Sequence, residues 1–234
     1  MNVLPGGITM VATSGLCREE NTVLVPTTTP VVFVVDDDIS IRESMELLIK
    51  NEGWHVETFT SAEEFLQRPN ESVASCLVLD ISMPGLNGLE LQKRLAVERP
   101  NMPIIFVTGH GDIRKTVQAM KAGAVEFLTK PFPDRTLVSA ISGAIERSKA
   151  LIGRDADFRA LRARYERLTA REREVMALVV LGSANKHVAS ELGISEITVK
   201  AHRGSMMRKM EADSLAELVN QAGRLRLSRP KVGA

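Results

Sequence analysis

The sequence places three acidic residues directly after five apolar ones, in Val31-Val32-Phe33-Val34-Val35-Asp36-Asp37-Asp38. A short apolar run rich in β-branched residues is typical of a strand that is buried on both faces. Apolar residues then recur at helical spacing at Ile41, Met45 and Ile49, and Gly53 provides the usual end of a helix. The stretch therefore predicts a buried strand followed by an amphipathic helix, which is the repeating unit of a parallel α/β sheet.

The same alternation of strand and helix continues to residue 149. The further predicted strands are His55–Phe59, Cys76–Leu79, Pro103–Val107 and Val125–Leu128. The helices predicted after them are one that begins at Ser61 and others around Leu89–Val97, Ile113–Ala122 and Asp134–Arg147. Five such units in about 120 residues predict a five-stranded, doubly wound parallel sheet with helices on both faces. We assign this α/β domain to residues 30–149.

The rest of the chain has other patterns. Residues 1–29 show no periodicity and are predicted to form a disordered N-terminal tail. Residues 150–167 are rich in Arg and Asp and are predicted to form a solvated helical linker. Residues 168–227 contain only helical patterns and are predicted to form a small all-α domain, followed by a C-terminal tail over residues 228–234.

Composition excludes several classes of protein. The apolar runs fall short of the ~20 residues that a membrane span needs, so a transmembrane protein is excluded. Two cysteines are too few for a disulfide framework or a zinc knuckle, which favours a reducing cytoplasm. Residues 30–149 carry 13 basic and 17 acidic side chains, whereas residues 150–234 carry 16 basic and 10 acidic ones. The basic second half is therefore a candidate to bind a polyanion.

Polar residues follow the predicted strands where these end. Asp36 and Asp37 follow the first strand, Asp80 the third, Thr108 the fourth and Lys130 the fifth. Ligands bind at the carboxyl ends of parallel strands, so these residues are candidates for one site. Neighbouring carboxylates repel one another unless they hold a cation, and Mg²⁺ prefers oxygen ligands. One carboxylate could then act as a nucleophile toward a phosphoryl group, with lysine and a hydroxyl stabilising its oxygens.

These residues lie in motifs that resemble the receiver domain of two-component response regulators. The motifs are Val35-Asp36-Asp37-Asp38, Asp80-Ile81-Ser82-Met83-Pro84-Gly85, Thr108-Gly109-His110-Gly111 and Lys130-Pro131-Phe132. The resemblance covers essentially all of residues 31–150. It implies that Asp80 accepts a phosphoryl group and that the Lys130-Pro131 peptide bond is cis.

The same resemblance implies the roles of the surrounding residues. The Mg²⁺ ligands would be Asp36, Asp37, Asp80 and the backbone carbonyl of Ser82. The groups that respond to the phosphoryl group would be Thr108, Lys130 and Phe127, the last as an aromatic switch that turns inward.

The rival chemistry is that of a Mg²⁺-dependent aspartyl phosphatase similar to the haloacid dehalogenases. Such enzymes need a nucleophilic Asp and an acid–base Asp two residues apart at the first strand. The acidic run Asp36-Asp37-Asp38 lacks the Gly-Thr that follows in those enzymes, and no cap domain is visible. The sequence therefore favours a protein that is not an enzyme.

The all-α region contains two helices separated by a short turn. Thr169 and Glu172 form a predicted capping box that opens the first helix of the region. Asn185 is predicted to cap a short helix that ends at Leu192. Gly193-Ile194-Ser195 then forms a tight turn, and Ser195 caps the next helix. A helix, a three-residue turn with glycine and a second helix are the pattern of a helix-turn-helix.

The second of these helices has one apolar face and one face suited to DNA. Val199, His202, Met206 and Met210 recur at helical spacing and are predicted to face inward. A helix fits the major groove, where Lys and Arg contact guanine or phosphate and small residues contact thymine methyls. The predicted DNA-binding residues are Lys186, Thr198, Lys200, Ala201, Arg203, Gly204, Arg208 and Lys209.

Residues 168–223 resemble the LuxR/FixJ-type output domain. The matches are Leu168-Thr169-x-Arg171-Glu172-x-Glu174-Val175, Asn185-Lys186-x-Val188-Ala189-x-x-Leu192-Gly193-Ile194-Ser195 and Thr198-Val199-Lys200-x-His202-x-x-x-Met206-x-x-Lys209. Gly204 departs from relatives, which often carry a long polar or basic residue there. A receiver followed by this output domain is similar to transcriptional response regulators of the FixJ/NarL class, on the FixJ branch.

The combined resemblance implies a cytoplasmic regulator that does not contact a membrane. Its partners would be a sensor histidine kinase, promoter double-stranded DNA, a second copy of the chain after phosphorylation, and RNA polymerase. One alternative stays open beside the enzyme: a DNA-binding regulator that works without phosphorylation and whose acidic pocket is vestigial. The intact pocket argues against that alternative.

Overall fold

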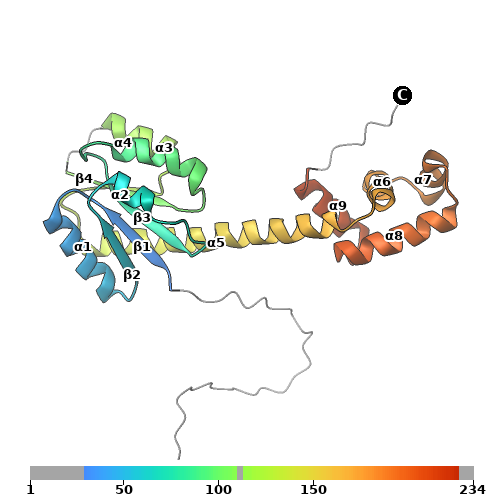
Figure 1. Ribbon diagram of the computed structural model, residues 1–234, viewed down its shortest axis with the longest axis horizontal. Coiled ribbons are helices and arrows are strands. Elements are labelled where there is room, and N and C mark those ends of the chain that lie inside the picture. Colours follow the sequence, from blue (N-terminus) through green and yellow to red (C-terminus); the bar gives the residue numbers. More distant parts are fainter. Residues whose placement is uncertain (1–28, 110–112, 227–234) are drawn as a thin grey trace, which may run out of the picture.

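The protein is seen in a computed structural model that describes residues 29–109 and 113–226. The predicted tails, residues 1–29 and 228–234, lie outside the described residues except for Thr29. A sheet with helices on both faces forms the N-terminal part, four short helices form the C-terminal part, and one long helix joins the two (Figure 1).

The sheet has five parallel strands in the order β2-β1-β3-β4-β5, which confirms the predicted fold class. The strands are β1 (Val31–Val35), β2 (His55–Phe59), β3 (Ser75–Asp80), β4 (Ile104–Thr108) and β5 (Glu126–Thr129). The chain passes from β1 outward to β2 and then returns to β3 on the other side of β1. The strand order therefore reverses between β1 and β3, where open α/β sheets bind their ligands.

Helices cover both faces of the sheet because successive side chains of a strand point to opposite sides. The helices around the sheet are α1 (Ile39–Asn51), α2 (Ala62–Gln67), α3 (Gly88–Glu98), α4 (Ile113–Lys121) and α5 (Asp134–Glu166). Phe33, Leu77 and Phe106 belong to the core layer that α2, α3 and α4 cover. Val34 and Ile105 belong to the layer that α1 and α5 cover.

Helix α5 is longer than the sequence predicts. The helix expected over Asp134–Arg147 continues without a break through the predicted linker to Glu166. This region contains no proline, and its many Ala, Leu and Arg residues favour helix. The first half of α5 buries Ile141 against the sheet, whereas Leu161 near its end is part of the core of the C-terminal helices. One helix therefore contributes to both hydrophobic cores.

The C-terminal part is all-helical, as predicted. Its helices are α6 (Ala170–Val179), α7 (Asn185–Leu192), α8 (Glu196–Met210) and α9 (Leu215–Arg224). Val175, Val188, Val199 and Met206 are fully buried and form one core with Leu161 of α5. Among the described residues, no helix is both long and apolar enough to span a bilayer.

Local capping predictions are partly confirmed. Thr169 and Glu172 form the predicted capping box, with each side chain accepting from the other residue's backbone N–H. The predicted cap by Asn185 is wrong, because Ala184 occupies the N-cap position and Asn185 is the first helical residue. The Asn185 side-chain oxygen instead accepts a hydrogen bond of 2.8 Å from the guanidinium of Arg203 in α8. A charged donor from a distant helix has replaced the local interaction.

Replacing either of two helical glycines, Gly88 or Gly143, by alanine should have opposite effects on stability. A Cβ at Gly88 would lie 2.4 Å from the backbone oxygen of Asp80, whereas a Cβ at Gly143 in α5 would meet nothing within 4 Å. We expect Gly88→Ala to lower the free energy of unfolding by about 1–3 kcal/mol through overpacking. Gly143→Ala should raise it by about 0.5–1 kcal/mol through helix propensity. Urea unfolding measures both, and equal stability of the two variants would contradict the close packing at Gly88.

Candidate functional site

Three carboxylates meet at the carboxyl edge of the sheet. Asp36 directly follows β1 and is 2% exposed, Asp80 ends β3 and is 8% exposed, and Asp37 is exposed. One oxygen of each lies within 4.8 Å of those of the other two. Because β1 and β3 are neighbours at the reversal of strand order, the fold brings together residues 44 positions apart in the sequence.

Lys130 compensates part of this negative charge. It directly follows β5, and its Nζ lies 2.6 Å from Oδ2 of Asp36. Its backbone N–H donates to the carbonyl oxygen of Thr108 at 2.8 Å, and the Lys130-Pro131 peptide bond is cis as predicted. The ion pair is mostly buried, since the Asp36 side chain is only 3% exposed. The Lys130 ammonium therefore places a positive charge directly beside one of the three acids.

The loop after β1 is fixed by further hydrogen bonds. The backbone N–H of Asp38 donates to Oδ1 of Asp36 at 2.9 Å, and the Asp38 side chain caps α1 by accepting from the N–H of Ser40. Nη1 of Arg42 donates to the carbonyl oxygen of Asp36 at 2.6 Å. The sequence did not identify Arg42 as part of this site, because an arginine in the first turns of an exposed helix carries no distinguishing signal.

The electrostatic environment raises the pKa of Asp80 above its ordinary value. Burial is the main cause, and the negative charge of Asp36 adds to it. The Lys130 ammonium and the backbone N–H groups of Ile81 and Ser82 act in the opposite direction. A divalent cation among these oxygens would act against this shift, because it favours the charged state of its ligands. Clustered carboxylate oxygens are a donor set that fits Mg²⁺.

The remaining predicted receiver residues surround this cluster. Asp80 is paired with Val107 across β3 and β4, so Thr108 lies one position beyond it, and Thr108 is 1% exposed. Ser82 lies two residues after Asp80 and is exposed. Phe127 lies on β5, half-buried, with its ring 6.4 Å from that of Phe106. The fold therefore brings the predicted site residues to the carboxyl edge of the sheet, except for Phe127, which lies within β5.

The helix-turn-helix consists of α7 and α8. Gly193 ends α7 with a φ of +65°, a conformation that suits glycine, and the Ser195 side chain caps α8 by accepting from the N–H of Thr198. Val199, Met206 and Met210 of α8 are fully buried, as predicted for the inward face, whereas His202, the fourth predicted member of that face, is half-buried. The predicted DNA-binding residues that are exposed are Lys200, Ala201 and Arg208 on α8 and Lys186 on α7.

Other predicted DNA-binding residues are engaged inside the domain. Nζ of Lys209 lies 2.7 Å from Oε2 and 3.0 Å from Oε1 of Glu172 in α6. Arg203 is bonded to Asn185, as described above, and both interactions fasten α8 to its neighbours. These contacts favour a structural role for Lys209 and Arg203 over the predicted base or phosphate contact.

The two remaining predicted residues, Thr198 and Gly204, form no such long-range interaction with the other described residues. Thr198 Oγ1 shares a hydrogen bond of 2.8 Å with Ser195 Oγ at the start of α8. Gly204 is half-buried, and a Cβ at that position would lie 3.6 Å from the Arg208 guanidinium, so space does not demand glycine there.

Comparison with known proteins places both halves of the chain. Residues 32–142 match the response regulator receiver domain, and residues 166–222 match the bacterial regulatory proteins of the luxR family. Nodulation protein W of Bradyrhizobium diazoefficiens is 49% identical over 201 residues, covering 86% of this chain and 88% of that protein. The transcriptional regulatory protein FixJ of Azorhizobium caulinodans is 44% identical, covering 82% and 90%. The chain belongs to the FixJ/NarL-class response regulators.

Solved structures agree with this assignment. The response regulator StyR has 44% sequence identity and a TM-score of 0.75, with 84% of this chain and 100% of that chain covered. Full-length FixJ from B. japonicum has 39% identity and a TM-score of 0.50, with 86% and 100% covered. This response regulator is therefore a two-component transcriptional regulator, whose family implies a sensor kinase as partner and DNA as the target of its output domain.

The ion pair between Lys209 and Glu172 also makes the regulator sensitive to acid. Burial alone would raise the pKa of Glu172, but hydrogen bonds from Lys209, Ser205 and Thr169 outweigh it and lower this pKa to about 2. A carboxyl whose pKa is lower in the folded than in the unfolded state stabilises the fold above its unfolded pKa. That contribution is present above about pH 4.5 and is lost as the pH falls toward 2.

We therefore expect Glu172→Gln to destabilise the output domain at pH 7 by about 2–3 kcal/mol, because it leaves the Lys209 ammonium without its partner. The difference from wild type should shrink as the pH is lowered from 5 toward 3. Urea unfolding at several pH values measures this. Glu174→Gln is the matched control, since Glu174 pairs with Arg171 at the surface and contributes less than about 1 kcal/mol. A constant difference across this pH range would contradict the lowered pKa.

Proposed function

We propose that Asp80 accepts a phosphoryl group from a sensor histidine kinase. The observation that carries this proposal is the cluster of Asp36, Asp37 and Asp80 within 4.8 Å, with Lys130 paired to one of its members. In the transfer, an Asp80 carboxylate oxygen forms a bond to phosphorus while the bond from phosphorus to the kinase's histidine nitrogen breaks. That nitrogen keeps the electron pair of the broken bond. Asp80 is suited to this role because it is the last residue of β3, at the carboxyl edge of the sheet, and a carboxylate can act as a nucleophile.

The residues of this site divide the remaining work between them. Mg²⁺, held by Asp36, Asp37, Asp80 and the carbonyl of Ser82, would neutralise the negative charges that converge during transfer. The new phosphoryl group adds a charge of about −1.5 to −2. It offers Lys130 a second anionic partner beside Asp36, and it offers the Thr108 hydroxyl an acceptor. Phe127 then turns inward toward the space beside Phe106, which changes the surface of α4, β5 and α5.

This altered surface joins two phosphorylated receivers, and the homodimer places two output domains on neighbouring half-sites of promoter DNA. The exposed residues Lys186, Lys200, Ala201 and Arg208 form the proposed interface, with Thr198 and Gly204 beside them. Arg203 positions α8 through Asn185. The regulator acts in the cytoplasm, contacts RNA polymerase at the promoter, and is not an enzyme.

The predicted domain organisation belongs to the same proposal. Residues 30–149 act as the receiver, residues 168–227 as the output domain, and residues 150–167 as the linker. Because the linker continues α5 as one helix, the receiver and the output domain are joined by a stiff element.

The first test is the mass of the intact protein after incubation with acetyl phosphate and Mg²⁺. Wild type should gain one phosphoryl group, and a chelator should prevent the gain. Asp80→Asn should gain nothing, whereas Asp134→Asn, which changes an exposed aspartate at the start of α5, should behave as wild type. Folded wild type that gains no mass would contradict the proposal. Sustained hydrolysis of a small phosphomonoester would support the phosphatase alternative instead.

A second test concerns the DNA interface. Lys200→Ala should weaken binding to duplex DNA and reduce the slope of log K against log salt by about 0.9, the value for one lost phosphate contact. Arg159→Ala, which removes an exposed charge from α5, should leave both quantities unchanged. Fluorescence anisotropy over a series of salt concentrations measures them. An unchanged slope for Lys200→Ala would show that α8 does not face DNA in the proposed way.

A further inference from the structure

Arg99, at the C-terminal end of α3, is a buried cation that forms no ion pair within the described part of the chain. Its side chain lies over the ring of Phe65, with the guanidinium carbon 4.6 Å from the ring centroid, and the residue is only 6% exposed. Nη2 donates to the backbone oxygen of Arg68. Nη1 is buried and has no hydrogen-bond partner in the described part of the chain, and no described carboxylate forms an ion pair with this residue. Leaving a charged donor buried and unpaired is costly.

The neighbouring Arg68 also lies over an aromatic ring, but its charge is compensated by two carboxylates. It lies over the ring of Phe33, at 4.7 Å, and its Nε and Nη2 donate to the two carboxylate oxygens of Glu57 at 2.7 and 2.8 Å. Glu71 adds a second ion pair at 3.6 Å. Glu57 and Glu71 therefore both pair with Arg68. Arg99 receives only the longer-range attraction of Glu98, so no described carboxylate contacts its guanidinium directly.

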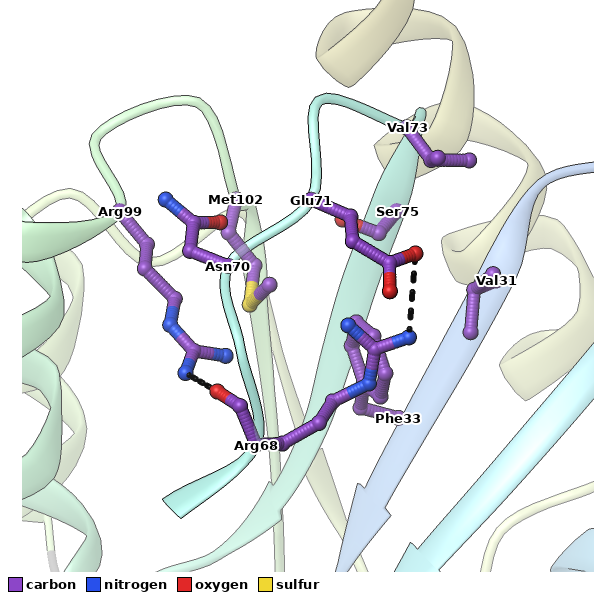
Figure 2. Close-up of a pocket in the computed structure, with 9 residues that line it drawn as sticks. All are labelled: Val31, Phe33, Arg68, Asn70, Glu71, Val73, Ser75, Arg99 and Met102. Carbon is purple, nitrogen blue, oxygen red and sulfur yellow. Dashed lines mark hydrogen bonds and ion pairs between the residues drawn. The ribbon is translucent and has the colours of Figure 1, made fainter. Parts of the chain in front are cut away.

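Arg99 lines a cavity at the amino edge of the sheet. Figure 2 shows the Arg99 guanidinium pointing from α3 toward Arg68 and Phe33, with Asn70 and Met102 beside it. A second hollow of about 70 Å³ adjoins this space. Since one water needs about 10–15 Å³, the hollow holds several non-hydrogen atoms. Its walls combine polar and apolar groups, among them Asn70, Ser75, Arg99, Val73, Met102 and Ile152.

We propose that this cavity binds a short-chain carboxylate. One carboxylate oxygen accepts a hydrogen bond from the Arg99 guanidinium, which places a negative charge beside this cation in a charge-assisted interaction. The hydrocarbon end of the ligand packs against Val73, Met102 and Ile152. A mixed lining with one convergent charged donor is typical of small-molecule sites. The site lies at the opposite end of β1 and β3 from Asp80 and is independent of the phosphorylation proposal.

The cavity wall is also attached to α5. Ile152 comes from that helix, and Oγ of Ser148, one turn earlier, accepts from the backbone N–H of Ser75 at 3.1 Å. The same hydroxyl donates to the carbonyl oxygen of Asn101 at 2.9 Å. A bound carboxylate would therefore touch both the sheet and the helix that leads to the output domain, and it would stabilise the packing of α5 on the receiver.

Thermal unfolding of the full chain tests the site, with sodium propionate replacing sodium chloride at constant ionic strength. Wild type should unfold at a temperature about 5 °C higher at saturating propionate, because a ligand that binds only the folded state stabilises it. Arg99→Met keeps the apolar stem on Phe65 but removes the donor, and it should lose this increase. Arg94→Met is the matched control, because Arg94 is an exposed arginine of the same helix outside the cavity, and it should keep the increase.

A second measurement uses wild type alone, so that it does not depend on the folding of a variant. Propionate titrated into ¹⁵N-labelled protein should shift the backbone amide signals of Ser75, Met102 and Ser148 in a saturable way, and chloride should not. The proposal would be overturned if wild type unfolded at the same temperature in sodium propionate as in sodium chloride of equal ionic strength. An equal response of Arg99→Met and wild type, or amide shifts that do not saturate, would also overturn it.

Discussion

The repulsion among three carboxylates at the end of β1 and β3 is the constraint on which this receiver depends. Asp36, Asp37 and Asp80 approach within 4.8 Å, and Asp36 and Asp80 are buried, so their charges are poorly screened by water. Lys130, which follows the outermost strand β5, compensates one of these charges, because its Nζ lies 2.6 Å from Oδ2 of Asp36. The carboxylates repel one another more than one lysine can compensate. The binding of a cation or a phosphoryl group would therefore change the electrostatic energy of the site. A site of this kind suits a switch.

The tight packing of the sheet allows a change at the acidic site to affect the helices that cover it. All five residues of β1 are buried, and both faces of the sheet are covered by helices, so the strand ends cannot shift individually without cost. Helix α5 begins shortly after Lys130, packs on the sheet through Ile141, and contributes Leu161 to the core of the output domain. The acidic site and the helix-turn-helix are thus connected by one continuous element. At the amino edge of the same sheet, the buried Arg99 and Ile152 of α5 line one cavity, so a second charged group lies close to this helix.

Most of the fold and the receiver site could be predicted from the sequence because their signals are local. Apolar runs followed by Asp36, Asp80 and Thr108 indicate buried strands with polar ends, and the parallel fold brings those ends together. The output domain was less predictable in detail. Asn185 has the chemistry of a helix cap, and Lys209 has the charge of a DNA contact, but each is engaged by a residue from another helix, Arg203 and Glu172 respectively. No spacing in the sequence distinguishes a lysine that faces DNA from one that faces a buried glutamate.

The sequence by itself determined the order of strands and helices, the identity of the acidic cluster and the helix-turn-helix, because these depend on periodicity and on residues close to one another in the chain. Only the tertiary structure decided that α5 is one helix through the linker, that Arg42 donates a hydrogen bond to the Asp36 carbonyl, and that Arg99 is buried with one nitrogen unpaired among the described residues. These features depend on which side chains from distant segments meet, and on the free energy of burying a charge at that place. Pairing and burial of this kind arise only when the chain is folded.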